Sequence, residues 1–471
     1  DYYWNTVKGL MEEEYQRFRR LNTFTMPGKY HLYLCPCPLY SVIWDSRFGT
    51  SIDPTRGTIF TLYTPDINTA WPMVITQSAI LRNYGYAPAF LTEGFASYLS
   101  FALYDMKKFR EQGKAQPITD FIATREYMAA DPILADRTSA TFVRYLIEQY
   151  QVPSFLDLYK RADDLNLGTA IEETYGKPLA DLEREWEMYL DTITFKPAQA
   201  RYYGSQAEAM REYDIMRDYA HLMLSLVATR EDSLAALALV IRADFSVGDY
   251  ASAARLQSLM ISSDSSRGDL RMTRAAYRMM NGEYDSALAD LQEAQRLDST
   301  DVLATFNLAL YNRNKGEVAR ARALLTNVIL DPAAAGAAIE SRVMLADILA
   351  LSDDDAYRSE AVTYYEEVVS DLERVIGQET GNPLPTQYMW LGAAYLGLAD
   401  LPRARQSLDM TLFLESRAFY VGYTELLLGK VADLEGRHAE AREHYGRVLA
   451  QPSADYHQQE ARKYLETPFR Q

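Results

Sequence analysis

The side chains that could bind a metal or act as a nucleophile are scarce in this 471-residue chain, which has five histidines and two cysteines. Only His31 lies in the first 195 residues; the others are His221, His438, His444 and His457. No two histidines are four positions apart, the spacing that brings two imidazoles from one helix to a zinc ion. A zinc peptidase site of the His-Glu-x-x-His type is therefore excluded. His438 and His444 are expected to face solvent on helical surfaces.

The two cysteines belong to the sequence Cys35-Pro36-Cys37, in a stretch that has the character of an extended strand. Alternating side-chain directions along a strand would place both sulfur atoms on one side. We favour two buried, unreactive thiols, because no third cysteine exists to complete a thiolate metal site. A redox pair, or half of a metal site, is the alternative.

Acidic residues outnumber basic ones by 65 to 48, which gives a net charge of −17. Such a surface repels phosphate groups, so nucleic acids and anionic membrane surfaces are disfavoured as partners. The sequence has no apolar stretch long enough to span a bilayer. It also lacks the glycine motifs that bind nucleotides or position a catalytic serine. No cofactor is expected.

The first part of the chain mixes two kinds of pattern. Two β-rich runs, 31–34 and 58–63, are separated by a polar stretch that predicts a loop. From Pro72 onward the apolar spacing is helical, and Pro88 and Pro153 stand where new helices can begin. The first 195 residues are therefore expected to form one domain that contains both strands and helices.

After about residue 200 the pattern is purely helical, and it repeats. The sequence Gly-x-Tyr-x-x-Ala ends at Ala253 and at Ala287, and a looser copy ends at Ala321, so two successive intervals are 34 residues. This period, together with the segment 391–395 (Leu-Gly-Ala-Ala-Tyr), resembles the tetratricopeptide repeat (TPR), a pair of helices. Further alanines in the same role are Ala361, Ala404 and Ala441.

Small residues precede the later marker alanines by 12 positions, where the two helices of a pair must approach closely: Ala275, Ala309, Gly392 and Gly429. We expect about six units within residues 234–471, with residues 196–233 as connecting helices. Each unit of a solenoid buries its apolar face against its neighbours, and the resulting groove usually binds polypeptide. A helical array that only spaces or stiffens is the alternative.

The segment 88–98, Pro-Ala-Phe-Leu-Thr-Glu-Gly-Phe-Ala-Ser-Tyr, resembles the second motif of gluzincin metallopeptidases in the peptidase-MA-like group. Segments 138–147 and 170–186 resemble the helix after the cleft and the closing pattern of that family. The resemblance covers residues 1–195. It implies an α+β domain in which Glu93 matches the family's third zinc ligand.

The zinc-binding helix of that family is degenerate in this chain. Thr76 and Ile80 stand where the two histidines would be, and Gln77 replaces the catalytic glutamate. Glutamine matches glutamate in shape but cannot accept a proton from water. The resemblance therefore implies a pseudoenzyme with no metal site. We favour Glu93 as a polar residue near a helix start, where the helix dipole stabilises a carboxylate.

The alternative role of Glu93 is in a vestigial cleft that still binds a peptide. An edge strand lines the cleft in this family, so Thr58, Phe60 and Leu62 would pair with an extended chain. Gln77 and Glu93 would then supply hydrogen bonds to the same peptide.

These observations predict an α+β degenerate gluzincin-like N-terminal domain, residues 1–195, followed by an all-α TPR solenoid. The predicted function is a non-catalytic protein-binding adaptor or structural subunit of a bacterial assembly. The predicted partners are other proteins. An extracytoplasmic location, periplasmic or membrane-associated, is expected because the chain starts at Asp1 as though a signal or anchor had been removed. A divergent metal-dependent hydrolase that retains Glu93, or a self-assembling homo-oligomeric scaffold, is the alternative.

Overall fold

The chain divides into two compact units, Asp1–Phe195 and Lys196–Gln471, in a computed structural model. The structure describes residues 31–35, 50–53, 58–62, 72–98, 102–209, 211, 213–227, 229–331, 334, 337–377 and 384–470. No helix in these ranges is long and apolar enough to cross a membrane.

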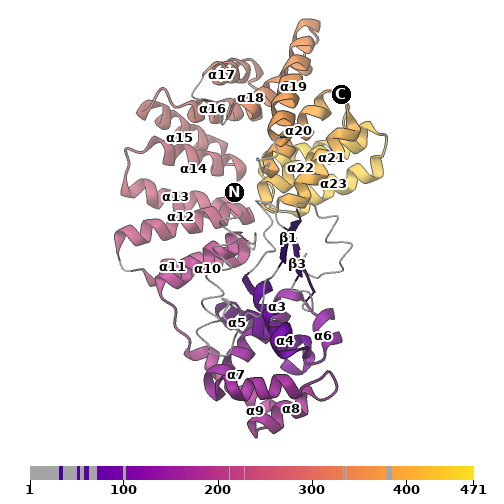
Figure 1. Cartoon of the computed structure of the whole chain (residues 1–471). Helices are drawn as coiled ribbons and strands as arrows, with labels where there is room; N and C mark the ends of the chain where they lie inside the picture. The colour runs from indigo at the N-terminus through magenta and orange to yellow at the C-terminus, as the bar shows by residue number, and fades with distance from the viewer. Residues whose placement is uncertain are drawn as a thin grey trace. The chain divides into compact units, whose positions relative to one another are not determined.

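The first unit contains a small three-stranded sheet with the strand order β1-β3-β2. Its strands are β1 (His31–Cys35), β2 (Thr50–Asp53) and β3 (Thr58–Leu62). β1 runs parallel to β3, with His31 opposite Thr58, and β2 runs antiparallel to β3. Helix α3 (Pro72–Tyr84) contacts both β2 and β3 (Figure 1).

The remaining described residues of the first unit are mostly helical. The helices after α3 are α4 (Ala89–Ser97), α5 (Ala102–Glu111), α6 (Thr124–Ala129), α7 (Pro132–Arg161), α8 (Leu167–Tyr175) and α9 (Leu179–Thr192), with a 3₁₀ turn at Ile118–Asp120. Pro88 directly precedes α4, as expected for a proline at a helix start. Helix α7 is kinked at Gln151, two residues before Pro153, so a new helical segment does begin there.

Aromatic side chains pack α4 against α7 and form the centre of this unit. Phe90 and Phe95 on α4 are fully buried. The Phe90 ring lies 6.0 Å from that of Phe142, and the Phe95 ring lies 4.8 Å from that of Phe155. Tilted and edge-on ring contacts at these distances add to the free energy gained by burying the rings.

The predicted fold class is wrong for the N-terminal half, because the described residues do not form an α+β gluzincin-like domain. The described core of the unit comes from helices α3 to α9 and the turns between them. Strands account for only 14 described residues, the sum of five, four and five. The described strands are four or five residues long, whereas the described helices bury large aromatic side chains against one another.

The second unit is built from helix pairs. It begins with α10 (Pro197–Ala209) and α11 (Tyr213–Leu226). Six pairs follow: α12 (Arg230–Val247) with α13 (Tyr250–Ser263), α14 (Gly268–Met280) with α15 (Tyr284–Leu297), α16 (Val302–Asn314) with α17 (Val318–Leu330), α18 (Ala338–Ala350) with α19 (Asp355–Ile376), α20 (Pro385–Gly397) with α21 (Leu401–Leu414), and α22 (Ala418–Leu434) with α23 (His438–Ala450). The final helix is α24 (Asp455–Glu466).

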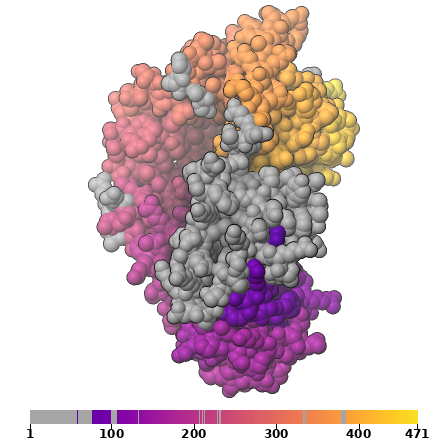
Figure 2. All heavy atoms as spheres, in the orientation of Figure 1, coloured from indigo at the N-terminus to yellow at the C-terminus, as the bar shows by residue number. Residues whose placement is uncertain are grey.

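This arrangement confirms the predicted TPR-like helical repeat. The alanines that end each sequence marker lie on the second helix of their pair and are at most 1% exposed: Ala253, Ala287, Ala321, Ala361, Ala404 and Ala441. The glycine that begins each of the first three markers has φ between +79° and +83°. Glycine adopts this left-handed conformation without the steric cost of a Cβ atom, so it ends the first helix and turns the chain into the second. In Figure 2 the colours of this unit follow the chain order from magenta through orange to yellow, as stacking of successive pairs requires.

The two ends of this repeat array touch. Helix α12 contacts α22, and α14 contacts α24. The Tyr284 hydroxyl donates a hydrogen bond to Asp455 across this junction at 3.1 Å. The Phe245 ring also lies 6.2 Å from that of Phe419. Helices α12 and α14, from the first two of the six pairs, therefore stabilise α22 and α24 directly.

Close approach of paired helices explains the small residues found in the sequence. A Cβ atom added to Gly429 on α22 would lie 2.3 Å from Cε1 of Tyr445 on α23, and one added to Gly392 would lie 2.7 Å from Leu408. Tyr445 is fully buried and its hydroxyl donates to Asp433 at 2.9 Å, so its ring has no space to move into.

We expect Gly429→Ala to lower the free energy of unfolding by about 1–3 kcal/mol, because the new methyl group overpacks the α22–α23 contact. The matched control is Gly446→Ala on α23, where an added Cβ meets no atom within 4 Å. That change is expected to raise stability by about 0.5–1 kcal/mol, since alanine favours the helix. Urea denaturation of both variants measures the difference. Equal effects of the two substitutions would contradict the packing argument.

Candidate functional site

The residues predicted to replace the zinc site lie on two neighbouring helices of the first unit. Thr76, Gln77 and Ile80 lie on α3, and Glu93 lies on α4. The amide Nε2 of Gln77 donates a hydrogen bond to Oε1 of Glu93 at 2.5 Å. Ile80 is fully buried in the core and Thr76 is 3% exposed. The structure therefore joins Gln77 to Glu93 and places Ile80 away from solvent.

The strand side of the predicted cleft is described only in part. Thr58 opens β3 and is half-buried, whereas the side chains of Phe60 and Leu62 lie outside the described residues. Cys35 ends β1, and Cys37 also lies outside them. A peptide-binding role for Thr58, Phe60, Leu62, Gln77 and Glu93 stays a prediction. Among the described residues, no three His, Cys, Asp or Glu side chains are grouped as metal ligands would be.

The prediction that His438 and His444 face solvent is wrong for His444. His444 is 7% exposed, and its Nδ1 lies 2.6 Å from Oε2 of Glu425, which is itself 5% exposed. His438 is exposed and its Nδ1 lies 2.8 Å from Asp433. Histidine at a helix-pairing position can be buried when a carboxylate from the facing helix supplies its hydrogen bond.

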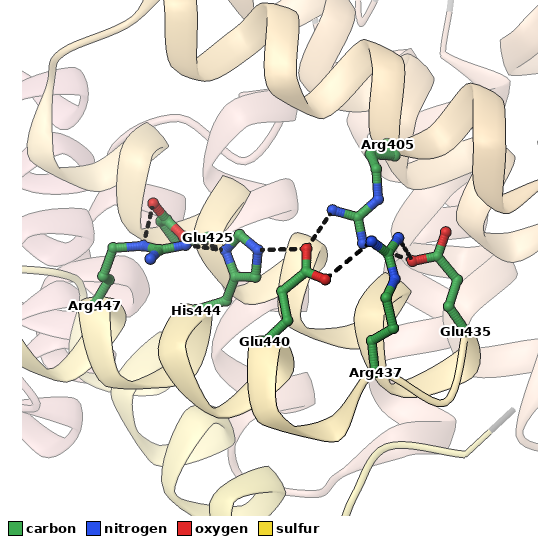
Figure 3. A network of polar contacts seen from close by, with 7 residues as sticks. All are labelled: Arg405, Glu425, Glu435, Arg437, Glu440, His444 and Arg447. Atoms are coloured by element: carbon green, nitrogen blue, oxygen red, sulfur yellow. Dashed lines mark hydrogen bonds and ion pairs between the residues drawn. The ribbon is translucent and has the colours of Figure 1, made fainter.

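His444 belongs to a polar network that ties α21, α22 and α23 together (Figure 3). Arg447 donates to Glu425 at 2.9 Å, and Arg405 donates to Glu440 at 2.7 Å. Nε2 of His444 lies 3.7 Å from Glu440, which therefore connects the two halves of the network. Every member described here has a partner of opposite charge or a hydrogen bond. We interpret this network as a structural one that holds the last helix pairs in place.

A pocket of about 860 Å³ lies within the second unit, lined by residues of α16, α17, α18, α19 and α24. Its lining combines charged, aromatic and apolar side chains. Arg313, Arg322 and Lys463 supply positive charge, and Asp347 and Glu460 supply negative charge. The guanidinium of Arg322 lies over the ring of Tyr357, 4.7 Å from its centroid.

The two carboxylates that line this pocket have donors of their own. The Tyr365 hydroxyl donates to Asp347 at 2.7 Å. Lys430 donates to Glu460 at 2.7 Å, and the Tyr464 hydroxyl donates to the same carboxylate at 3.0 Å. Burial alone would raise the pKa of Glu460, but the charges of Lys430 and Arg313 outweigh it and lower that pKa to about 2. Glu460 is therefore ionised at neutral pH.

His457, also on α24, is buried beside the pocket. Its ring stacks on Tyr423 with 4.9 Å between centroids and 18° between planes. Burial lowers the pKa of His457 to about 3, so the imidazole is neutral. A neutral ring in this position leaves the positive charge of the pocket to the arginine and lysine side chains.

Sequence reasoning missed this pocket, although one signal for it was available. Arg313 and Asp347 both lie in the last turn of the first helix of their pair, α16 and α18. Charged residues at one repeat position line up on one face of a solenoid. The contribution of α24 was not visible in this way, because that helix follows the last complete pair.

No protein-family model matches the chain, and no curated protein matches it. No family model therefore supports the resemblance to gluzincin peptidases.

Among solved structures, the chain is similar to a tetratricopeptide repeat protein from Parabacteroides merdae, at 12% identity and a TM-score of 0.37, over 57% of this chain and 97% of that one. It is also similar to a thermophilic TPR protein from Thermus thermophilus, at 21% identity and a TM-score of 0.32, over 42% of this chain and 100% of that one. Similarity to yeast Tom70 covers 98% of this chain and 95% of that one, at 13% identity and a TM-score of 0.31. The repeat assignment rests on the helix pairs of the chain itself.

Glu340 on α18 provides a test of burial in the second unit, because its pKa depends on how far its carboxyl is removed from water. Burial raises the pKa of Glu340 to about 7. A carboxyl whose folded pKa lies above its unfolded value stabilises the fold at low pH, and this contribution is lost as pH rises from about 4.5 to 7. Glu340→Gln should therefore raise the free energy of unfolding at pH 8 relative to pH 5.

We expect a gain at pH 8 of about 1–2 kcal/mol, less than a fully buried group would give because this side chain is partly exposed. Urea denaturation at the two pH values measures it. Glu366→Gln on the exposed side of α19 is the control and should show no such pH dependence. If Glu340→Gln has the same effect at pH 5 and pH 8, the carboxyl does not titrate as its burial requires.

Proposed function

We propose that the chain is a non-catalytic adaptor that binds other proteins through the helical repeats of its second unit. The observation that carries this proposal is the pocket between α16–α19 and α24, where charged, aromatic and apolar side chains meet. Helical repeat arrays commonly use such surfaces to bind polypeptide. Leu351, which lines the pocket, is 85% exposed, and Val318 in the same lining is 50% exposed.

In the first unit, the contact between two predicted site residues, Gln77 and Glu93, supports a non-catalytic role. The amide of Gln77 is bound to Glu93, and an amide cannot serve as a general base. We further propose that the chain belongs to a bacterial, extracytoplasmic assembly. The absence of an Asn-x-Ser/Thr glycosylation sequence agrees with a bacterial source.

Leu351→Ser tests the pocket as a protein-binding surface. Because Leu351 is exposed, the substitution should leave the fold intact while removing apolar area from the binding surface. Full-length protein captured from its source cells should carry a partner at fixed stoichiometry, and Leu351→Ser should weaken that association by about tenfold, as loss of one apolar anchor does.

Leu330→Ser is the matched control, because Leu330 is also exposed, at 74%, and does not line the pocket. It should retain the partner. A native mass that is a multiple of 53.6 kDa without any other chain would support the homo-oligomeric scaffold instead. Bound stoichiometric metal, lost together with a hydrolase activity in Glu93→Ala, would support the enzyme.

A further inference from the structure

The pocket between α16–α19 and α24 contains two cationic side chains, Arg322 and Lys463, that form no ion pair with another described residue. Arg313 also lines the pocket, but its charge stabilises the ionised carboxylates of Asp347 and Glu460. The carboxylates in the same lining, Asp347 and Glu460, accept hydrogen bonds from tyrosine or lysine. The negative charges of the pocket are thus balanced internally, and the positive charges of Arg322 and Lys463 are not.

A neutral residue of the same lining, Asn314, has an amide group without a hydrogen-bond acceptor. Its Nδ2 atom is inaccessible to solvent, and the residue lines the pocket next to Arg313. A buried amide group without a partner is costly, and such a group at a binding surface is commonly satisfied by the ligand. Because Nδ2 has no accessible surface, a ligand with acceptor oxygens would reach it only after the Asn314 side chain turned toward the pocket.

The charge balance gives the sign and the size of the ligand charge. Arg313 stabilises the ionised form of Asp347, and Lys430, which lies outside the pocket lining, donates to Glu460. Arg322 and Lys463 add two more positive charges. Asp347 and Glu460 contribute two negative charges, so an excess of two positive charges remains. This excess lies in a chain whose net charge is −17. A ligand with two carboxylates would balance it, whereas a single chain terminus would not.

Exposed apolar side chains in the pocket lining indicate that the ligand also carries an apolar group. Val318 and Leu351, the exposed apolar residues noted above, lie in the same lining as Arg322. A ligand that places an apolar side chain beside its carboxylates would cover them while its oxygens reach the cations. Charge complementarity and apolar contact thus both favour a peptide segment that has carboxylates next to an apolar side chain.

We propose that this pocket binds an acidic peptide segment, one in which two Asp or Glu side chains flank an apolar residue. The proposal rests on the proposed protein-binding function and names the partner chemistry. Arg322 and Lys463 bind the carboxylates, and Val318 and Leu351 cover the apolar side chain. Asn314 donates to the ligand once its side chain has turned toward the pocket.

The experiment uses the full-length chain and a fluorescent peptide of about twelve residues with two glutamates around a leucine. The peptide is acetylated and amidated, so its termini carry no charge. Its counterpart has both glutamates replaced by glutamine. Fluorescence anisotropy should show the acidic peptide binding at least about tenfold more tightly than the counterpart, with affinity falling as salt rises.

Arg322→Gln and Lys463→Gln should each weaken binding of the acidic peptide by about five- to tenfold. Arg320→Gln on α17 and Arg462→Gln on α24 are the matched controls, because both side chains are exposed and lie outside the pocket lining. They should leave the affinity unchanged. Circular dichroism of all four variants checks that each remains folded.

Equal binding of the two peptides, no binding of either, or equal losses in the pocket and control variants would each overturn the proposal. Failure of the proposed function is a separate result. If a cellular partner is still captured in a Leu351-dependent way but not affected by Arg322→Gln and Lys463→Gln, the adaptor role stands and the acidic ligand is wrong.

Discussion

The closeness of the two helices within each pair is the constraint on which the second unit depends. Ala275 and Ala309 are fully buried, and Gly392 and Gly429 leave no space for even one added methyl group. Each pair packs on the one before it, so the spacing within one pair sets the position of all later pairs. The contact between α14 and α24, and the pocket that α24 helps to line, therefore depend on small residues far from either.

Charge is distributed unevenly in this acidic chain. On α21–α23, Glu425, Glu440, His444 and their arginine partners satisfy one another and join the helices. Around the pocket, tyrosine and lysine satisfy the acids, and cations remain available. Similar residue types thus serve two purposes, because buried charges stabilise a fold only when they are paired, whereas unpaired charges at an accessible surface favour a ligand.

The repeats could be predicted from the sequence because the 34-residue spacing of Ala253, Ala287 and Ala321 reflects direct contacts between neighbouring helices. The fold class of the first unit could not be predicted in this way. The short β-rich runs and the segment 88–98 do not reveal that Phe90 and Phe95 pack against α7. The burial of His444 was missed since its partner Glu425 lies on another helix. Of the candidate site, the direct contact of Gln77 with Glu93 could not be predicted from spacing, and the pocket needs α24, which the repeat period does not indicate.

The junction between α12–α14 and α22–α24 has a consequence for how this array can vary and unfold. An open repeat array can gain or lose a unit at little cost, and its ends can fray independently. Here Tyr284 and Asp455, 171 positions apart, meet only if the number of intervening units is kept. Insertion or deletion of a single repeat would separate them. The array should therefore be fixed in copy number and should unfold as one cooperative body, with its two ends protected from hydrogen exchange to a similar degree.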